Sequence, residues 1–243
     1  MALTKLKSSG IADGAVTADG LATGAVTVAD IADETITVAK ISGNAAASAD
    51  TFLKKDGTWA TVSTTSDIEL LNTYTLSDVA SLEITTASYF SATYASLVFK
   101  FIHMQPATDN VHLRFSLGTG ATPTYNNDFY SMFATNQGHN STTGHWAQDT
   151  SYFSWPNTYA TLFKELGNGA DENCSGNLEV FNASSATYEK MFNASLTGHL
   201  YHDYMLCSWS SGGFNLATAC TAIKFFFSSG NIANGIVKVY GAR

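Results

Sequence analysis

The chain has 243 residues, of which 12 are basic and 20 are acidic, and its formal net charge is -8. Arg114 and Arg243 are its only arginines, so it has few of the planar guanidinium groups that phosphate recognition favours, and we do not expect a nucleic acid partner. Aromatic residues are nearly as frequent as charged ones, 12% against 13%, a balance that favours a β-rich protein. No apolar run has transmembrane length, so membrane insertion is not expected.

Residues 11–40 contain a ten-residue repeat: IADGAVTADG, LATGAVTVAD and IADETITVAK. The large apolar side chains recur in register, and they are Ile11, Val16, Leu21, Val26, Ile31, Ile36 and Ile41. Two such side chains per repeat cannot offset the cost of ordering a lone backbone, about 1 to 2 kcal/mol per residue. We therefore predict that residues 1–43 form a repeat-built stalk in which several identical chains bury these side chains around a common axis. The alternative is a flexible linker that lies along a partner.

Residues 44–66 interrupt the repeat and are interpreted as a collar or linker. Within this segment, Asp56-Gly57 predicts a tight turn between Phe52-Leu53 and Trp59.

Residues 67–243 alternate short segments rich in Val, Ile, Thr, Tyr and Phe with clusters of Gly, Asn, Asp and Ser, which predicts an all-β domain. The predicted strands are residues 69–76, 94–104, 112–117, 177–182, 189–196, 222–228 and 235–241. Since no long amphipathic helix is visible, two stacked sheets are the expected way to bury the apolar faces, and we predict a jelly-roll-like β-sandwich head.

A metal site is not expected. The segment HLYHD places His199, His202 and Asp203 close together, but on a strand the two histidines would face opposite sides, so structural or solvent-facing roles are favoured. The three cysteines have no C-x-x-C spacing. No cofactor is expected either.

Carbohydrate recognition is the binding chemistry that the composition favours, because sugar rings need aromatic faces and their hydroxyls need amides or carboxylates. Two polar, aromatic segments are interpreted as candidate loops. The candidate binding residues are Tyr125, Asn126, Asn127, Asp128, Tyr130, Asn136, Gln137, His139, His145 and Trp146. Trp155, Trp209 and Phe214 are further aromatic candidates, although core packing is the commoner role of such residues.

No enzyme activity is expected. The sequence has no nucleophile elbow, phosphate loop or metalloprotease helix. Several acids are present, but the sequence cannot pair any two of them across a glycosidic bond, so we predict no catalytic residues.

The GAVT-type repeats followed by FLKKDGTWATV resemble phage tail-fibre and other fibre-type virion proteins, and the C-terminal SSGNIANGIVKVYGAR is similar to the closing strand of phage structural proteins. The resemblance covers mainly residues 10–62. It implies a homotrimeric tail fibre in the virion, attached to other virion proteins through its N-terminus and binding host-surface polysaccharide or a receptor through its head. The alternatives are a head fibre or capsid decoration protein and, less favoured, a polysaccharide depolymerase.

Overall fold

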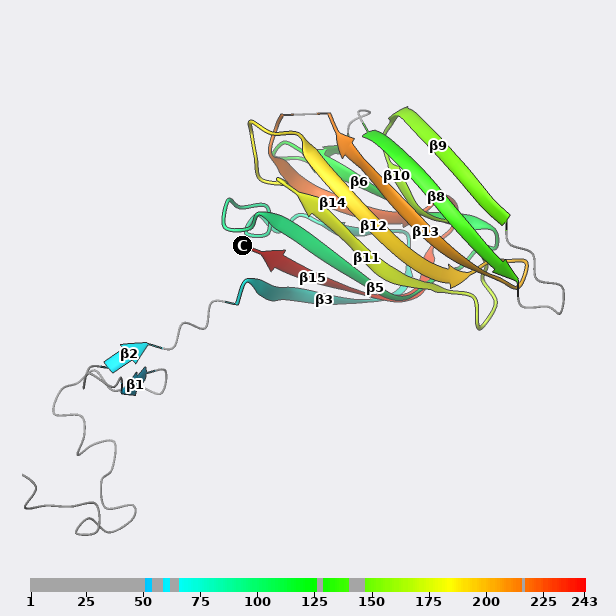
Figure 1. Cartoon of the computed structure of the whole chain (residues 1–243), viewed down its shortest axis with the longest axis horizontal. Helices are drawn as coiled ribbons and strands as arrows, with labels where there is room; N and C mark the ends of the chain where they lie inside the picture. Colours follow the sequence, from blue (N-terminus) through cyan, green and yellow to red (C-terminus); the bar gives the residue numbers. More distant parts are fainter. Residues whose placement is uncertain (1–50, 54–58, 62–65, 126–128, 140–146, 216) are drawn as a thin grey trace, which may run out of the picture. The chain divides into compact units, whose positions relative to one another are not determined.

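A computed structural model describes residues 51–53, 59–61, 66–125, 129–139, 147–215 and 217–243 (Figure 1). Contact clustering divides the chain into two compact units, residues 1–64 and 65–243. The predicted stalk, with Ile11, Val16, Leu21, Val26, Ile31, Ile36 and Ile41, lies outside the described residues.

The first unit contributes a short antiparallel pair. Strand β1 (Thr51–Leu53) pairs with β2 (Trp59–Thr61), and Leu53 lies opposite Trp59. These strands flank the segment with Asp56-Gly57, where the tight turn is predicted. The turn residues themselves lie outside the described part of the chain.

The second unit is all-β and contains two antiparallel sheets (Figure 1). The eight-stranded sheet has the order β3-β15-β5-β11-β12-β13-β8-β9. Its strands are β3 (Ile68–Val79), β5 (Ser96–Pro106), β8 (Phe129–His139), β9 (Ala147–Asn157), β11 (Cys174–Phe181), β12 (Lys190–His199), β13 (Tyr204–Phe214) and β15 (Ile232–Ala242).

The five-stranded sheet lies behind the eight-stranded sheet in Figure 1. Its order is β10-β6-β14-β4, and β7 pairs with β6 outside this path. Its strands are β4 (Leu82–Ile84), β6 (Val111–Thr119), β7 (Thr124–Tyr125), β10 (Ala160–Leu166) and β14 (Cys220–Phe227).

The core lies between the two sheets and is rich in phenylalanine. The ring of Phe225 on β14 meets the rings of Phe99 and Phe101 on β5 edge to face, each at a centroid distance of 5.1 Å. Phe115 on β6 meets Phe192 on β12 in the same way at 5.0 Å. Because each pair joins one sheet to the other, burial of these rings holds the sheets face to face.

The strand order of the two sheets is easier to describe if β8, β9, β12 and β13 are first left out. If the short β7 is left out as well, eight strands remain: β3, β4, β5, β6, β10, β11, β14 and β15. Counted in chain order, these eight strands lie in the orders 1-8-3-6 and 2-7-4-5 in the two sheets. The four added strands extend the first sheet beyond β11, and this extension widens its outer face.

All seven predicted head strands overlap observed strands. In β15, Val237 and Val239 are fully buried while Ile236 and Lys238 are half-buried, so the strand is at least partly covered on both faces. The prediction that the two candidate segments are loops is wrong for their described candidate residues, which all lie in strands: Tyr125 in β7, and Tyr130, Asn136, Gln137 and His139 in β8. In the part of the chain that the structure describes, no helix has the length and apolar character needed to cross a membrane.

Candidate functional site

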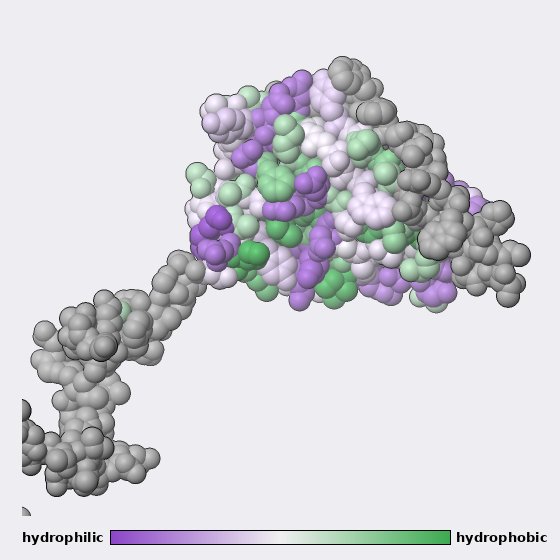
Figure 2. Space-filling view, in the orientation of Figure 1, coloured by the Kyte–Doolittle hydropathy of each residue, from purple (hydrophilic) through white to green (hydrophobic). Residues whose placement is uncertain are grey.

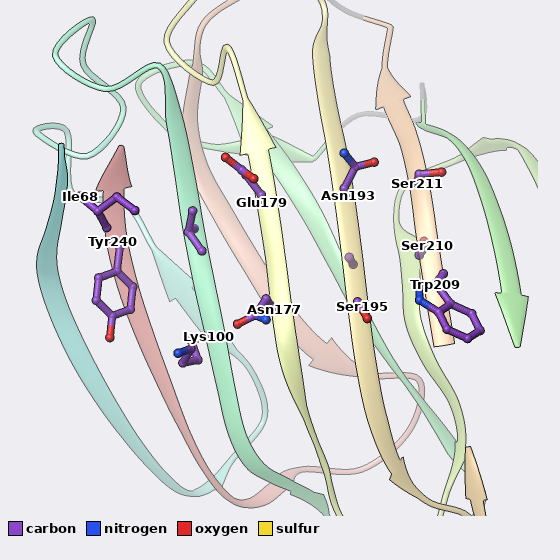
Figure 3. Close-up of a pocket in the computed structure, with 12 residues that line it drawn as sticks. Ile68, Lys100, Asn177, Glu179, Asn193, Ser195, Trp209, Ser210, Ser211 and Tyr240 are labelled. Carbon is purple, nitrogen blue, oxygen red and sulfur yellow. The ribbon is translucent and has the colours of Figure 1, made fainter. Parts of the chain in front are cut away.

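The outer face of the eight-stranded sheet carries a shallow groove of about 780 Å³ (Figure 3). Successive side chains of a strand point to opposite faces, so every second residue of β5, β11, β12, β13 and β15 is directed away from the core and into this face. Figure 2 shows hydrophilic and hydrophobic residues interspersed over the described part of this side of the molecule.

One row of the groove runs straight across five strands. Tyr240 pairs with Val98, Val98 with Glu179, Glu179 with Asn193, and Asn193 with Ser211. Residues directly opposite each other in antiparallel strands have Cβ atoms about 4.5 to 5.5 Å apart, so this register places the five side chains in one line.

The second row lies two residues along each strand. Lys100 pairs with Asn177, Asn177 with Ser195, and Ser195 with Trp209. This row places an ammonium group at one end, an indole ring at the other, and an amide and a hydroxyl between them. The indole is 45% exposed, which is large for a tryptophan on a sheet surface.

The groove is hollow because its middle residues are short and its ends are bulky. Asn193, Ser195 and Ser211 form the floor on β12 and β13. Figure 3 shows Tyr240 near one end of the lining and Trp209 at the other. A polar floor between two aromatic groups can hold an elongated ligand that has both hydroxyl groups and apolar faces.

Glu179 is held in place within the groove. The Ser96 hydroxyl donates a hydrogen bond to its Oε1 at 2.6 Å, and Glu179 is itself half-buried. Among the described residues that line the groove, Glu179 is the only carboxylate. A fixed carboxylate beside two amides can accept hydrogen bonds from ligand hydroxyls without first having to be ordered.

The predicted residue Tyr125 lies elsewhere, against a smaller hollow of about 420 Å³ on the five-stranded sheet. Its hydroxyl donates a hydrogen bond to Glu83 Oε1 at 2.5 Å, and Lys224 Nζ lies 5.5 Å from its ring centroid. Partial burial, together with the Glu83 carboxylate, raises the pKa of Tyr125 above its ordinary value. This tyrosine is therefore already engaged within the fold.

The other predicted residues divide into three groups. Tyr130 lies in β8 opposite Gly213. Ala134, four residues further along β8, pairs with Trp209, and positions an even number of residues apart share a face, so Tyr130 lies on the same outer face as the groove. Asn136, Gln137 and His139 also lie in β8, where they pair with β13. Asn126, Asn127, Asp128, His145 and Trp146 lie outside the described residues.

The aromatic candidates differ in their outcome. Trp209 lines the groove, whereas Phe214, in the same strand, is fully buried in the core. Asn177 and Asn193 were missed as binding candidates because their sequence segments read only as strands. The alternation of buried and exposed positions along each strand was the available signal, since Asn193 lies between the buried Phe192 and Ala194, and Asn177 directly precedes the buried Leu178.

A possible metal-ligating cluster lies away from the groove. Glu172, His199 and Asp203 each offer one ligand atom, and these atoms lie within 4.8 Å of one another. Strand β12 ends at His199, and a turn at 201–203 returns the chain into β13, so the opposite facing that a continuous strand would give HLYHD does not apply. The turn directs Asp203, rather than His202, toward His199.

Comparison of the chain with protein-family models, with curated proteins and with solved structures finds no match. The chemistry of the site therefore has to be argued from its own residues. The groove offers an exposed indole, a phenol, two amides, two hydroxyls, one ammonium group and one carboxylate, which together are suited to non-covalent recognition of a polar ligand with ring faces.

Proposed function

We propose that this chain is a bacteriophage virion fibre protein whose β-sandwich head binds host-surface glycan in the outer groove. The observation that carries the binding proposal is the half-exposed Trp209 at the end of a row of amide and hydroxyl groups. The resemblance of residues 10–62 to fibre-type virion proteins supports placing it on a virion. The repeats would then form a stalk that joins three chains and attaches them to other virion proteins.

We further infer that the head is a jelly roll with four added strands. The orders 1-8-3-6 and 2-7-4-5 in the two sheets support this topology, in which two Greek keys form a double sheet. The added strands β12 and β13 supply Asn193, Ser195, Trp209 and Ser211, so the extension of the sheet is what lengthens the groove. This links the proposed topology to the proposed function.

In the proposed complex, the indole of Trp209 stacks against the apolar face of one sugar ring. Asn177, Asn193 and the Glu179 carboxylate bind hydroxyl groups of the neighbouring rings, and Lys100 favours an acidic sugar or a phosphate substituent at the other end. A shallow groove of this kind binds each glycan weakly. Three heads on one stalk would combine such weak contacts into firm attachment.

Binding rather than cleavage is proposed because of the carboxylates. Hydrolysis of a glycosidic bond ordinarily uses two carboxyl groups about 5 to 10 Å apart. Glu179 stands alone among the described groove residues, so the groove lacks the second group.

The test is binding of the full-length protein to an array of purified bacterial capsular polysaccharides and lipopolysaccharides. We expect Trp209→Ala to weaken the binding of any retained glycan about tenfold or more, because the ring is the main apolar contact. The matched control is Met191→Ala, an exposed residue of the same outer face outside the groove lining, which should bind as the wild type does. Absence of any retained glycan, or equal binding by Trp209→Ala, would contradict the proposal.

A further inference from the structure

One end of the sandwich brings two loops together, and these loops carry Glu172, His199 and Asp203. Glu172 precedes β11, whereas His199 ends β12 and Asp203 precedes β13. Their ligand atoms, one from each side chain, all lie within 4.8 Å of one another. The cluster combines one imidazole with two carboxylates, a set that differs from a simple patch of acids.

The backbone fixes the two loops to each other. The Tyr201 N–H donates to the Glu165 carbonyl at 3.2 Å, and the His199 N–H donates to the Asn173 carbonyl at 3.0 Å. The first hydrogen bond joins the turn at 201–203 to the end of β10, and the second joins the end of β12 to the loop between β10 and β11. The three side chains are therefore held near one another before any ligand arrives, which lowers the entropy cost of binding.

Glu172 is the most constrained of the three. It is 8% exposed, and its Oε2 accepts a hydrogen bond from the Gly169 N–H. A Cβ atom at Gly167 or Gly169 would collide with this carboxylate, so the loop packs around it as closely as glycine allows. Within the described part of the chain, no salt bridge to Glu172 is present, and a buried carboxylate is costly unless it is paired or coordinates a cation.

His199 also has a buried polar atom without a partner in the described part of the chain. Its Nδ1 is inaccessible to solvent and has no hydrogen-bond partner among the described residues. A buried polar atom left without a partner destabilises the folded protein. An ion bound beside it is one of the arrangements that satisfy such an atom.

We propose that Glu172, His199 and Asp203 form a binding site for a divalent transition-metal ion of the Zn²⁺ type. The mixed nitrogen and oxygen set favours Zn²⁺ over Ca²⁺ and Mg²⁺, which prefer oxygen ligands alone. A tetrahedral Zn²⁺ with bonds of about 2.0 to 2.1 Å places its ligand atoms about 3.3 Å apart. The cluster contracts to this size mainly through Asp203, which is exposed and therefore the freest of the three to move.

The bound ion would clamp the β12–β13 turn to the loop between β10 and β11. Three protein ligands leave the fourth tetrahedral position to water. The site is separate from the groove, because none of the three residues belongs to the groove lining, so metal binding and glycan binding can be measured independently.

The test uses full-length protein stripped with EDTA and then titrated with Zn²⁺ by calorimetry. One ion should bind per chain at this site, and Zn²⁺ at about 100 times its Kd should raise Tm by roughly 5 to 10 °C. Glu172→Gln and His199→Ala should each remove this binding event and the rise in Tm. His202→Ala is the matched control, since His202 lies in the same turn outside the cluster, and it should keep both.

Three results would overturn the proposal. The first is a titration in which Zn²⁺ does not bind to the wild type. The second is unchanged binding in both Glu172→Gln and His199→Ala, which would place the ion elsewhere. The third is Ca²⁺ that binds more tightly than Zn²⁺, since this would contradict a role for the imidazole. Circular dichroism of the metal-free variants distinguishes a lost site from a lost fold.

Discussion

The two faces of the eight-stranded sheet are built from the same strands yet have opposite chemistry. In β5, Phe99 and Phe101 point into the core at 1% exposure, whereas Lys100 between them is exposed. In β12, Phe192 is buried and its neighbour Asn193 lines the groove. A period of two thus lets one strand supply core residues on one face and the residues of the proposed binding groove on the other.

The inner face also holds a charged side chain. Lys190 takes an inward position at the start of β12 and is 1% exposed. Its Nζ donates to the carbonyls of Ser185 at 2.6 Å and of Tyr188 at 3.1 Å. A charged side chain is thus tolerated inside where backbone acceptors surround it. Burial lowers the pKa of Lys190, as expected for an ammonium group taken out of water.

The largest expected change in stability comes from replacing one residue of the inner face. Phe101→Ala should lower the free energy of unfolding by about 3 to 5 kcal/mol, because it removes a fully buried ring that contacts Phe225. The measurement is urea unfolding followed by tryptophan fluorescence. The matched variant Lys100→Ala, next to it on the outer face, should change stability by no more than about 0.5 kcal/mol. A similar loss of stability in both variants would contradict the conclusion that the inner face supplies the stability and the outer face does not.

A smaller difference in stability is expected between alanine variants of two inner serines of β13. The Ser208 hydroxyl donates to the Leu162 carbonyl at 2.8 Å, whereas the buried Ser210 hydroxyl has no hydrogen-bond partner among the described residues. Ser208→Ala should therefore destabilise the protein by about 1 kcal/mol. Ser210→Ala should be neutral or slightly stabilising in the same unfolding experiment, since it removes an unsatisfied group. Equal losses would show that inner hydroxyls contribute regardless of their partners.

The smallest expected change in stability is a pH dependence that arises from His112, which is half-buried on the outer face of β6. Burial, with the nearby charges of Arg114 and Lys164, lowers its pKa below the ordinary 6.5, and its Nδ1 accepts a hydrogen bond from the Glu165 N–H at 3.0 Å. The unfolded chain therefore binds the proton first, so stability should fall as pH drops below about 6.5 and level off once the folded form is also protonated.

The measurement is the urea midpoint between pH 7.5 and 5. His112→Asn keeps an acceptor near the Glu165 N–H and should show a shallower decline than the wild type. His103→Asn, an exposed histidine on β5, is the control and should decline as the wild type does. Identical curves for His112→Asn and the wild type would exclude this histidine as a source of the pH dependence.

Strand prediction succeeded where alternation was strong, and it missed β4, β7, β8, β9, β10 and β13. The segments at 94–104, 189–196 and 235–241 alternate clearly, and each overlaps an observed strand. Residues 204–214, with Ser208, Ser210 and Ser211 followed by two glycines, were not predicted as a strand. They form β13 because β12 and β8 flank them and satisfy their backbone on both sides. Strand propensity depends on such neighbours.

The sequence by itself determined the β class of the head, most of its strands and the kinds of side chain available for binding, because these follow from local periodicity and composition. Which of those side chains meet depends on the tertiary structure. Asn177, Asn193 and Trp209 are distant in sequence, and cross-strand register places them in one groove. Glu172 likewise reaches His199 and Asp203 only through the contact of two loops. Register and loop packing are long-range properties, set by the burial of the whole core rather than by any local pattern.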